Sequence, residues 1–244
     1  MSSEAFFERV GDVLDAIRAN ETESMRRVTE ALVRCIRDDR MIFTFGSGHS
    51  SLLAAEGLYR AGGLACVSAI LEPATTFAGG ALAGTAFERM RGVHRGVVDR
   101  YGVTAGDVLV LFSNSGVNPL PVELAADCRD RGLTTVAVTS RRYVARVTGS
   151  DARCTTVLDV ADHVIDNHVP PGDAVIDIGS DGRQAAPVST IAGAFIWNAL
   201  VADVAAQLAA LAITPPVYVS SNMAGSKEVN ADLVERYRNR IRNL

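Results

Sequence analysis

Residues 41–51 read MIFTFGSGHSS, a short apolar run that ends in glycine and passes directly into serines. Similar apolar runs recur later in the chain: ACVSAI (65–70), DVLVLF (107–112), TTVAVT (134–139) and, more weakly, HVID (163–166). These runs are short, rich in β-branched or aromatic residues, and apolar on both faces, which is typical of buried parallel strands. The sequence therefore predicts a parallel sheet.

Helical patterns separate these strands. They span about 49–61, 86–101, 118–131 and 187–212, and a last one lies near 226–243. Strands that alternate with helices of this length predict a doubly wound α/β fold. We expect one domain over residues 1–244, and the segment AVIDI (174–178) allows an additional hairpin.

The N-terminal arm reads as one long amphipathic helix over residues 4–37. Apolar residues recur at helical spacing from Phe6 to Ile36. The stripe is longer than one small sheet can cover, so residues 1–40 are expected to pack on the domain and on a dimer partner. A homodimer is therefore predicted.

Composition excludes several classes of function. The net charge of −4 over 244 residues argues against nucleic-acid and membrane-surface partners. Lys227 is the only lysine among 24 basic residues. Schiff-base, pyridoxal-phosphate and Walker-type phosphate chemistry all need a placed lysine, so none of them is expected.

The cysteine spacing and the composition of the apolar segments predict a cytoplasmic protein. Cys35, Cys66, Cys128 and Cys154 are scattered without metal-ligand spacing, as in proteins with reduced thiols. The first twenty residues carry early acids and no apolar core of a secretion signal. The longest apolar segment (191–213) contains three polar residues, which favours a helix in the protein core over a membrane-spanning helix. We expect no metal and no cofactor.

The candidate site lies where the strands end, because ligands of open parallel sheets bind at the carboxyl edge. Gly46–Ser51 follows the first strand, Ser113–Asn118 follows the third, and Thr139 and Ser140 end the fourth. Glycines let backbone N–H groups approach a ligand, and such groups at a helix start bind anions without lysine. The alternative is that these serines are ordinary helix caps. A dinucleotide fingerprint does not fit, because the first loop lacks its third glycine.

The chain resembles the sugar isomerase (SIS) domain family. The resemblance is carried by FGSGHSSLLAAEGLYRAGG (45–63), LFSNSGVNPLPVELA (111–125), VAVTS (136–140), APVSTIAGAFIWNAL (186–200) and PPVYVSSN (215–222). It implies an αβα sandwich around a five-stranded parallel sheet, usually in a homodimer, and a sugar phosphate as ligand. The residues expected to bind this ligand are Ser47, Gly48, Ser50, Ser113, Asn114, Ser115, Asn118, Thr139, Ser140 and Ser189.

Within the family the chain is similar to phosphosugar and phosphoheptose isomerases, and this resemblance implies aldose–ketose isomerisation. That reaction needs a carboxylate base and a second proton-transfer group. Glu56 is the candidate base, because it follows His49 by two helical turns, and phosphoheptose isomerases carry a glutamate in the corresponding helix. His49 and His168 are the candidate partners. Arg60, four residues after Glu56, offers the alternative of a plain salt bridge.

Other functions remain open on the sequence. The paired histidines of the late phosphoheptose isomerase helix have no counterpart in residues 187–212. A non-catalytic phosphosugar-binding or sensor module is therefore an alternative, as is lyase or deaminase chemistry on an amino-sugar phosphate.

Overall fold

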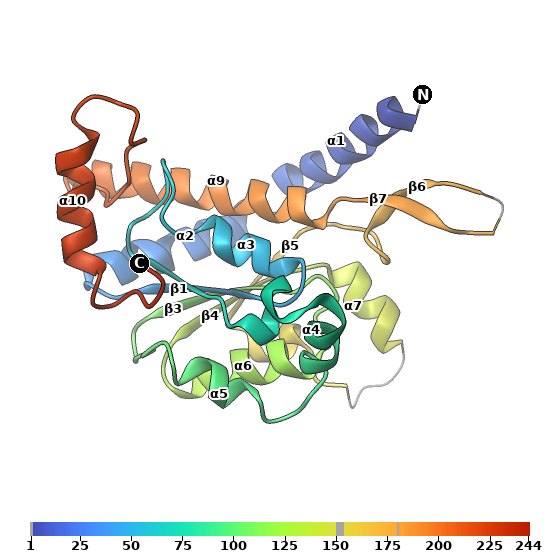
Figure 1. Cartoon of the computed structure of the whole chain (residues 1–244). Helices are drawn as coiled ribbons and strands as arrows, with labels where there is room; N and C mark the ends of the chain where they lie inside the picture. Colours follow the sequence, from blue (N-terminus) through green and yellow to red (C-terminus); the bar gives the residue numbers. More distant parts are fainter. Residues whose placement is uncertain (1, 150–153, 180) are drawn as a thin grey trace.

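A five-stranded parallel sheet forms the centre of the fold, as predicted (Figure 1). The computed structural model describes residues 2–149, 154–179 and 181–244. The strand order is β2-β1-β3-β4-β5, and every neighbouring pair is parallel. The strands are β1 (Ile42–Gly46), β2 (Val67–Ile70), β3 (Val108–Phe112), β4 (Thr134–Thr139) and β5 (His163–Asp166). All five predicted apolar runs are therefore confirmed as strands.

Helices cover both faces of this sheet. One layer contains α2 (Thr22–Arg37), α3 (Ser50–Glu56) and α9 (Ser189–Ala210), and α9 contacts both of the other helices. The opposite layer contains α5 (His94–Val98), α6 (Pro119–Asp130) and α8 (Val157–Val160). Both faces of the central strands are buried, and Trp197 of α9 packs edge-on against Phe112 of β3. The apolar character of the strands on both sides follows from this sandwich.

The order of the strands places the switch point between β1 and β3. The chain leaves β1 towards β2 on one side, and leaves β3 towards β4 on the other side. A crevice forms at such a switch point, outside the carboxyl ends of the two strands. The fold therefore brings the two serine-containing loops, residues 47–50 and 113–118, to one place.

The N-terminal arm is two helices, so the prediction of a single helix over 4–37 is wrong. α1 (Ser2–Asn20) ends before Glu21, and α2 begins at Thr22. The Glu21 side chain is buried and accepts hydrogen bonds from the Asp166 backbone N–H and the Ser24 hydroxyl. This tertiary contact bends the chain at a point where the helical periodicity continues through the sequence.

The prediction of one helix over residues 86–101 is also wrong. The connection from β2 to β3 contains the short turns η1 (Pro73–Thr75) and η2 (Phe77–Gly79), then α4 (Ala81–Phe87) and α5. Gly92 lies between α4 and α5 with a φ of +76°, a left-handed conformation that ends a helix. α3 is likewise shorter than the predicted 49–61. It ends at Glu56, and the following Gly57 packs so closely that an added Cβ would lie 3.0 Å from Trp197 and Val67.

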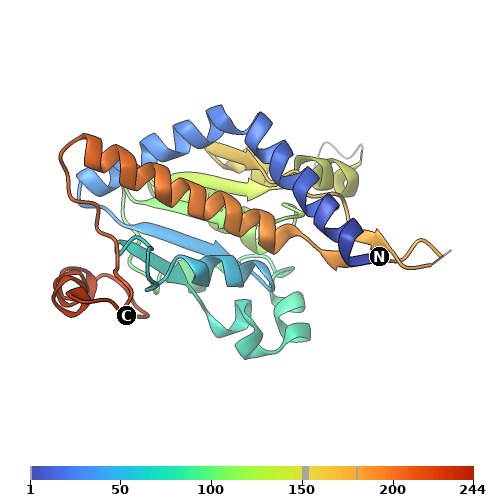
Figure 2. The same ribbon diagram turned by 90° about the horizontal axis from the view of Figure 1, so that it is seen from above.

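The additional hairpin is present. Its strands β6 (Ala174–Asp177) and β7 (Gln184–Pro187) pair in antiparallel fashion before α9 begins. Figure 2 shows that the hairpin and α1 extend together beyond the end of α9. α9 is long and apolar enough to cross a membrane by length and composition, and here it lies across the sheet with Trp197 in the core. The remaining helices are α7 (Arg141–Thr148) and α10 (Ser226–Tyr237).

Candidate functional site

The first loop of the site starts immediately after β1. Gly46 is required there, because a Cβ at this position would lie 2.2 Å from the Ser50 carbonyl oxygen. Gly48 follows with a φ of +57°, and its N–H donates to the Thr75 carbonyl. This tight turn lets α3 begin at Ser50 directly above the carboxyl end of β1.

The second loop presents a row of free backbone donors. The N–H groups of residues 114–118 donate to no protein group in the described part of the chain. Gly116 shapes the loop: its φ is +63°, and an added Cβ would lie 2.8 Å from Val144. Five consecutive free N–H groups before the N-terminus of α6 form a cradle for an anion.

Three serine hydroxyls accompany this cradle. Ser50, Ser113 and Ser115 are each partly exposed. Their hydroxyls make no hydrogen bond with the residues that the structure describes, whereas the hydroxyls of Thr139 and Ser140 do. The three hydroxyls are therefore without a partner in the described part of the chain, and their role in binding a phosphate stays a prediction.

Thr139 and Ser140 have structural partners. Both are fully buried. The Thr139 hydroxyl points to the Asn114 carbonyl at 3.4 Å, and the Ser140 hydroxyl donates to the Val169 carbonyl at 2.6 Å. Ser140 also caps α7 by accepting from the Tyr143 N–H. In this structure the two side chains hold neighbouring loops together, and Ser140 has the helix-cap role of the alternative.

Glu88 is a site residue that the sequence analysis did not identify. It lies at the C-terminal end of α4, and its side chain is 17% exposed. One carboxylate oxygen accepts from the Ser47 hydroxyl at 2.7 Å, and the other accepts from the Asn118 side-chain amide at 2.9 Å. A single carboxylate thus bridges the two loops. No sequence signal marks it, because it lies in a stretch that reads as a surface helix.

Glu56 lies at the C-terminal end of α3. Six residues after Ser50 correspond to about 9 Å along a helix axis. One oxygen of Glu56 accepts from Arg60 and, at 3.1 Å, from the Asn198 amide of α9. The pairing with Arg60 that the spacing allowed is therefore present, and the side chain is 26% exposed.

The two candidate histidines lie in different places. His49 is exposed in the first loop, and its ring packs edge-on against Phe77 at 4.8 Å between centroids. His168 follows β5, and its Nε2 lies 3.0 Å from a carboxylate oxygen of Glu21. A chain of contacts joins this region to the second loop, because the Asn167 amide donates to the Asn114 side chain at 3.0 Å.

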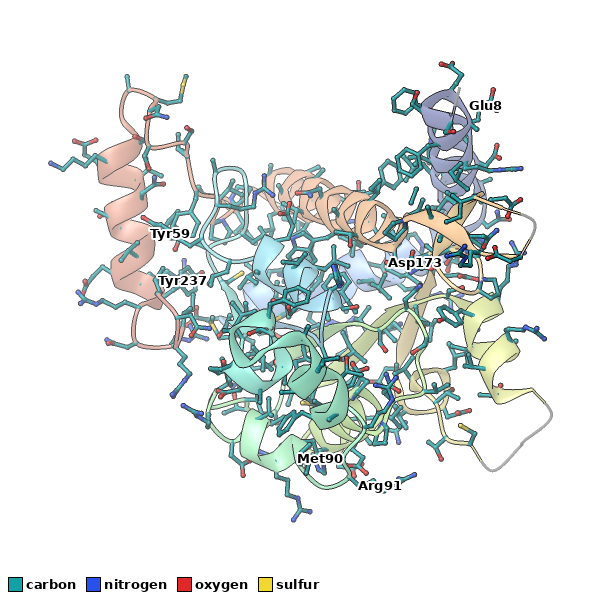
Figure 3. The ribbon with its side chains drawn as sticks, turned by 45° about the vertical axis from the view of Figure 1, so that its right-hand side comes forward. Glu8, Tyr59, Met90, Arg91, Asp173 and Tyr237 are labelled. Atoms are coloured by element: carbon teal, nitrogen blue, oxygen red, sulfur yellow. The ribbon has the colours of Figure 1, made fainter. Side chains whose placement is uncertain are left out.

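Ser189 is the first residue of α9, and the Asp173 carboxylate holds it in place. Its hydroxyl donates to Asp173 at 2.6 Å, and the same carboxylate accepts from the backbone N–H groups of Val188 and Ser189. Figure 3 shows Asp173 where the hairpin meets α9. This contact fixes the end of the helix, and none of the described contacts joins Ser189 to the serine loops. Within the described residues, no three His, Cys, Asp or Glu side chains gather as metal ligands.

Known proteins match nearly the whole chain. The family described as SIS domain matches residues 5–140. A UPF0309 protein of Brucella canis is 41% identical over 242 residues, covering 99% of this chain and 98% of the relative. A UPF0309 protein of Brucella anthropi is 40% identical over 242 residues with the same coverage.

Solved structures share the fold at low identity. A phosphoheptose isomerase from Neisseria gonorrhoeae superposes with a TM-score of 0.53 and 21% identity, covering 84% of this chain and 97% of that one. A phosphoheptose isomerase from Francisella tularensis gives a TM-score of 0.50 and 15% identity, covering 82% and 95%. Because the match over residues 5–140 exceeds half of the chain and agrees with this shared architecture, the chain belongs to the SIS domain family.

Proposed function

We propose that the two serine loops bind the phosphate group of a sugar phosphate. The row of free N–H groups at residues 114–118 carries this proposal, since it lies at the switch point between β1 and β3. The hydroxyls of Ser113 and Ser115 add two donors on the same loop. Hydrogen bonds to a charged acceptor are the strong ones, so this neutral cradle needs no lysine. The family membership and the names of the solved relatives point to the same ligand class.

We further propose that the protein isomerises its ligand between the aldose and ketose forms. In this reaction a carboxylate takes the proton from the carbon next to the carbonyl, the carbonyl oxygen gains a proton, and an enediol results. The proton then returns to the former carbonyl carbon, and the other enediol hydroxyl loses its proton to the second group as the new carbonyl forms. Glu56 is the proposed base, and His49 or His168 is the proposed second group. Glu56 lies on α3, which starts at the first serine loop, and this continuity supports its role.

A second candidate function is binding without catalysis. The observation that favours it is the engagement of Glu56 by Arg60 and Asn198, which is the arrangement of a structural ion pair. In this case the protein would hold a phosphosugar for a protein partner. The proposed setting in both cases is a homodimer in the cytoplasm, where the buried thiols stay reduced.

One experiment separates the two functions. The purified protein is incubated with a panel of aldose and ketose phosphates in deuterated water, and exchange at the carbon next to the carbonyl is followed by proton NMR. Thermal shift on the same panel reports binding. Isomerisation predicts both deuterium exchange and stabilisation by one pair of isomers, whereas the binding module predicts stabilisation alone. Loss of stabilisation in a Ser113→Ala, Ser115→Ala double variant would attribute binding to the second loop.

A further inference from the structure

A cavity lies at the carboxyl edge of the sheet, beside β4 and β5 and apart from the serine loops. Its volume is about 380 Å³, within the range of small-molecule sites. The walls come from α1, the start of α7, the loop after β5, and the β6–β7 hairpin. No residue of the loops 47–50 or 113–118 lines it.

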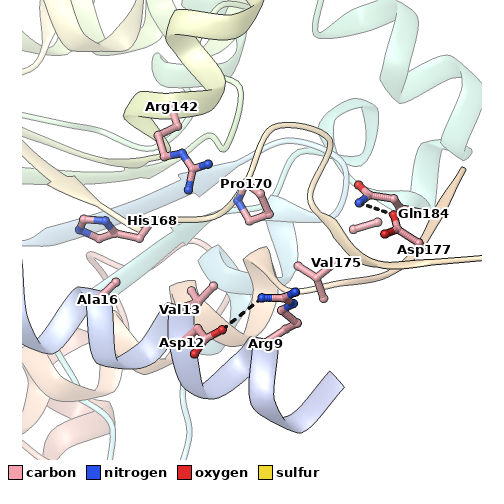
Figure 4. Close-up of a pocket in the computed structure, with 11 residues that line it drawn as sticks. Arg9, Asp12, Val13, Ala16, Arg142, His168, Pro170, Val175, Asp177 and Gln184 are labelled. Atoms are coloured by element: carbon pink, nitrogen blue, oxygen red, sulfur yellow. Dashed lines mark hydrogen bonds and ion pairs between the residues drawn. The ribbon is translucent and has the colours of Figure 1, made fainter. Parts of the chain in front are cut away.

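Two arginines from different elements face this cavity. Arg142 comes from α7 and Arg9 from α1, and Figure 4 shows both guanidinium groups extending into the same space. Arg9 has an acidic neighbour in Asp12 at 3.5 Å, but both side chains are more than 60% exposed. Such an exposed pair contributes little free energy, so Arg9 can exchange Asp12 for a ligand. Guanidinium groups bind phosphate and carboxylate through paired N–H donors.

The rest of the lining suits hydroxyl groups. Asp12 and Asp177 supply carboxylate acceptors, and Gln184 supplies an amide that donates to Asp177 at 3.0 Å. Pro170 and Val175 add a short apolar wall. Basic groups with nearby acids and an amide recognise a molecule that carries one anionic group and several hydroxyls.

The backbone beside this cavity is held in a strained conformation. His168 lines the cavity with a φ of +54°, which is uncommon for a residue other than glycine. The contacts to Glu21 and to Asp166 hold it there, because the ring meets the Glu21 carboxylate and the His168 N–H donates to Asp166 at 2.9 Å. Glu21 also lies between α1 and α2. The same residue therefore sets the direction of α1 and, with it, the position of Arg9. The cavity is thus shaped by contacts between distant parts of the chain.

We propose that this cavity is a second ligand site, which takes a sugar bearing a phosphate or carboxylate group. Arg142 and Arg9 bind the anionic group, and the side chains of Asp12, Asp177 and Gln184 bind the hydroxyls. The inference goes beyond the serine-loop site, and it holds whether or not that site is catalytic. Asn167, which precedes the lining residue His168, donates to the Asn114 side chain of the second serine loop.

The test uses calorimetric titration with glucose 6-phosphate, gluconate and glucose as probes, each up to about 10 mM. The Ser113→Ala, Ser115→Ala double variant removes two hydroxyl donors of the serine loops and leaves their backbone N–H groups in place. The effect of Arg142→Ala in this background, and not the residual binding itself, therefore reports the second site. Arg142→Ala in this background should weaken the remaining binding of an anionic probe at least about tenfold, as expected for one lost charge-assisted contact. Arg146→Ala is the matched control, since Arg146 lies on the same helix outside the cavity. Glucose should bind neither version.

The outcomes distinguish the two sites. Full loss of anion binding in the serine double variant would overturn the second site and leave the serine-loop proposal standing. Unchanged binding in the double variant, with loss on Arg142→Ala, would support the second site and overturn the serine-loop proposal. Equal effects of Arg142→Ala and Arg146→Ala would overturn the second site, and so would the absence of binding by both anionic probes. Circular dichroism melting of each variant confirms that it is folded.

Discussion

The Ser47 hydroxyl donates a hydrogen bond of 2.7 Å to a carboxylate oxygen of Glu88, although 41 residues separate them in the sequence. The second oxygen of Glu88 accepts from Asn118 at the start of α6. A carboxylate therefore lies between the two loops that we expect to bind a phosphate, and its pairing with the half-exposed Arg89 at 3.3 Å offsets only part of its charge. Like charges this close repel strongly, because the site is partly withdrawn from water.

We expect Glu88→Gln to tighten the binding of inorganic phosphate by about 1 kcal/mol, since the variant keeps the side-chain shape and removes the repulsion. Calorimetric titration at two salt concentrations measures this change. Glu228→Gln, an exposed change on α10, is the control for net charge. Weaker binding in Glu88→Gln would contradict the repulsion and would mean that Glu88 holds Ser47 and Asn118 in their binding positions.

Ser115→Ala should weaken sugar-phosphate binding by about 1–2 kcal/mol, the scale of one hydrogen bond to a charged group. Its hydroxyl has no partner in the described residues, so the melting temperature should stay unchanged. Thr139→Ala is the contrasting variant. Thr139 is buried against the Asn114 carbonyl, so this change should lower the free energy of unfolding by about 1 kcal/mol. Thermal melting and titration of both variants test these two expectations. Weaker ligand binding in Thr139→Ala, together with unchanged binding in Ser115→Ala, would assign the ligand contact to Thr139.

The sheet could be predicted from the sequence because each strand is apolar on both faces and is followed by a helix. That signal is local, and it located all five strands and the two serine loops. The break at Glu21 could not be predicted, because its cause is a set of contacts to Asp166 and His168 far along the chain. Helical periodicity continues through this position and carries no trace of those contacts.

The candidate site also contains residues that could be predicted from the sequence and residues that could not. Ser113 and Ser115 could be located from the strand ends, since a loop after a parallel strand always reaches the carboxyl edge. Glu88 could not, because the connection from β2 to β3 reads as one helix while Gly92 folds it into two short ones. The burial of Thr139 and Ser140 also depends on neighbouring loops, which a strand-end rule does not describe.

Glu56→Gln should lower isomerisation at least about 10²-fold while leaving ligand binding intact, because a proton-abstracting base acts in the transition state. Deuterium exchange and thermal shift measure the two properties separately. Asn198→Ala is the matched variant, since it removes a partner of Glu56 and keeps the carboxylate. Turnover near the level of the unmodified protein in Glu56→Gln would assign Glu56 to its ion pair with Arg60.

A thiol reagent at pH 8 should label one cysteine of the folded protein. Burial raises the pKa of Cys66 and of Cys128 to about 12 and raises the pKa of Cys35 above its usual range. The reactive form is the thiolate, so these three thiols stay protonated and unreactive at pH 8. Cys154 is exposed. Mass spectrometry should find Cys154 modified in the folded protein and all four cysteines modified after denaturation. Labelling of Cys66 without denaturant would contradict the burial.

The protein should form a homodimer through α1. This helix extends from the domain beside the β6–β7 hairpin, and Phe7 is 66% exposed on it. Ile178 of the hairpin is 57% exposed, and Ile191 near the start of α9 is 39% exposed. Exposed large apolar side chains on a projecting helix and the elements beside it are typical of a surface that meets another protein. A second copy can cover the arm with its own, because a two-fold interface uses the same patch on both chains.

Light scattering at micromolar concentration should therefore give twice the chain mass of 25.8 kDa. Phe7→Ser should shift the equilibrium towards monomer by about 2 kcal/mol, the scale of one buried aromatic side chain at an interface. Arg18→Ala, an exposed change on the same helix, is the control and should leave the mass unchanged. A stable monomer of the unmodified protein would contradict the arm as an interface. A dimer that persists in Phe7→Ser would place the contact on the apolar surface of α9 and the hairpin instead.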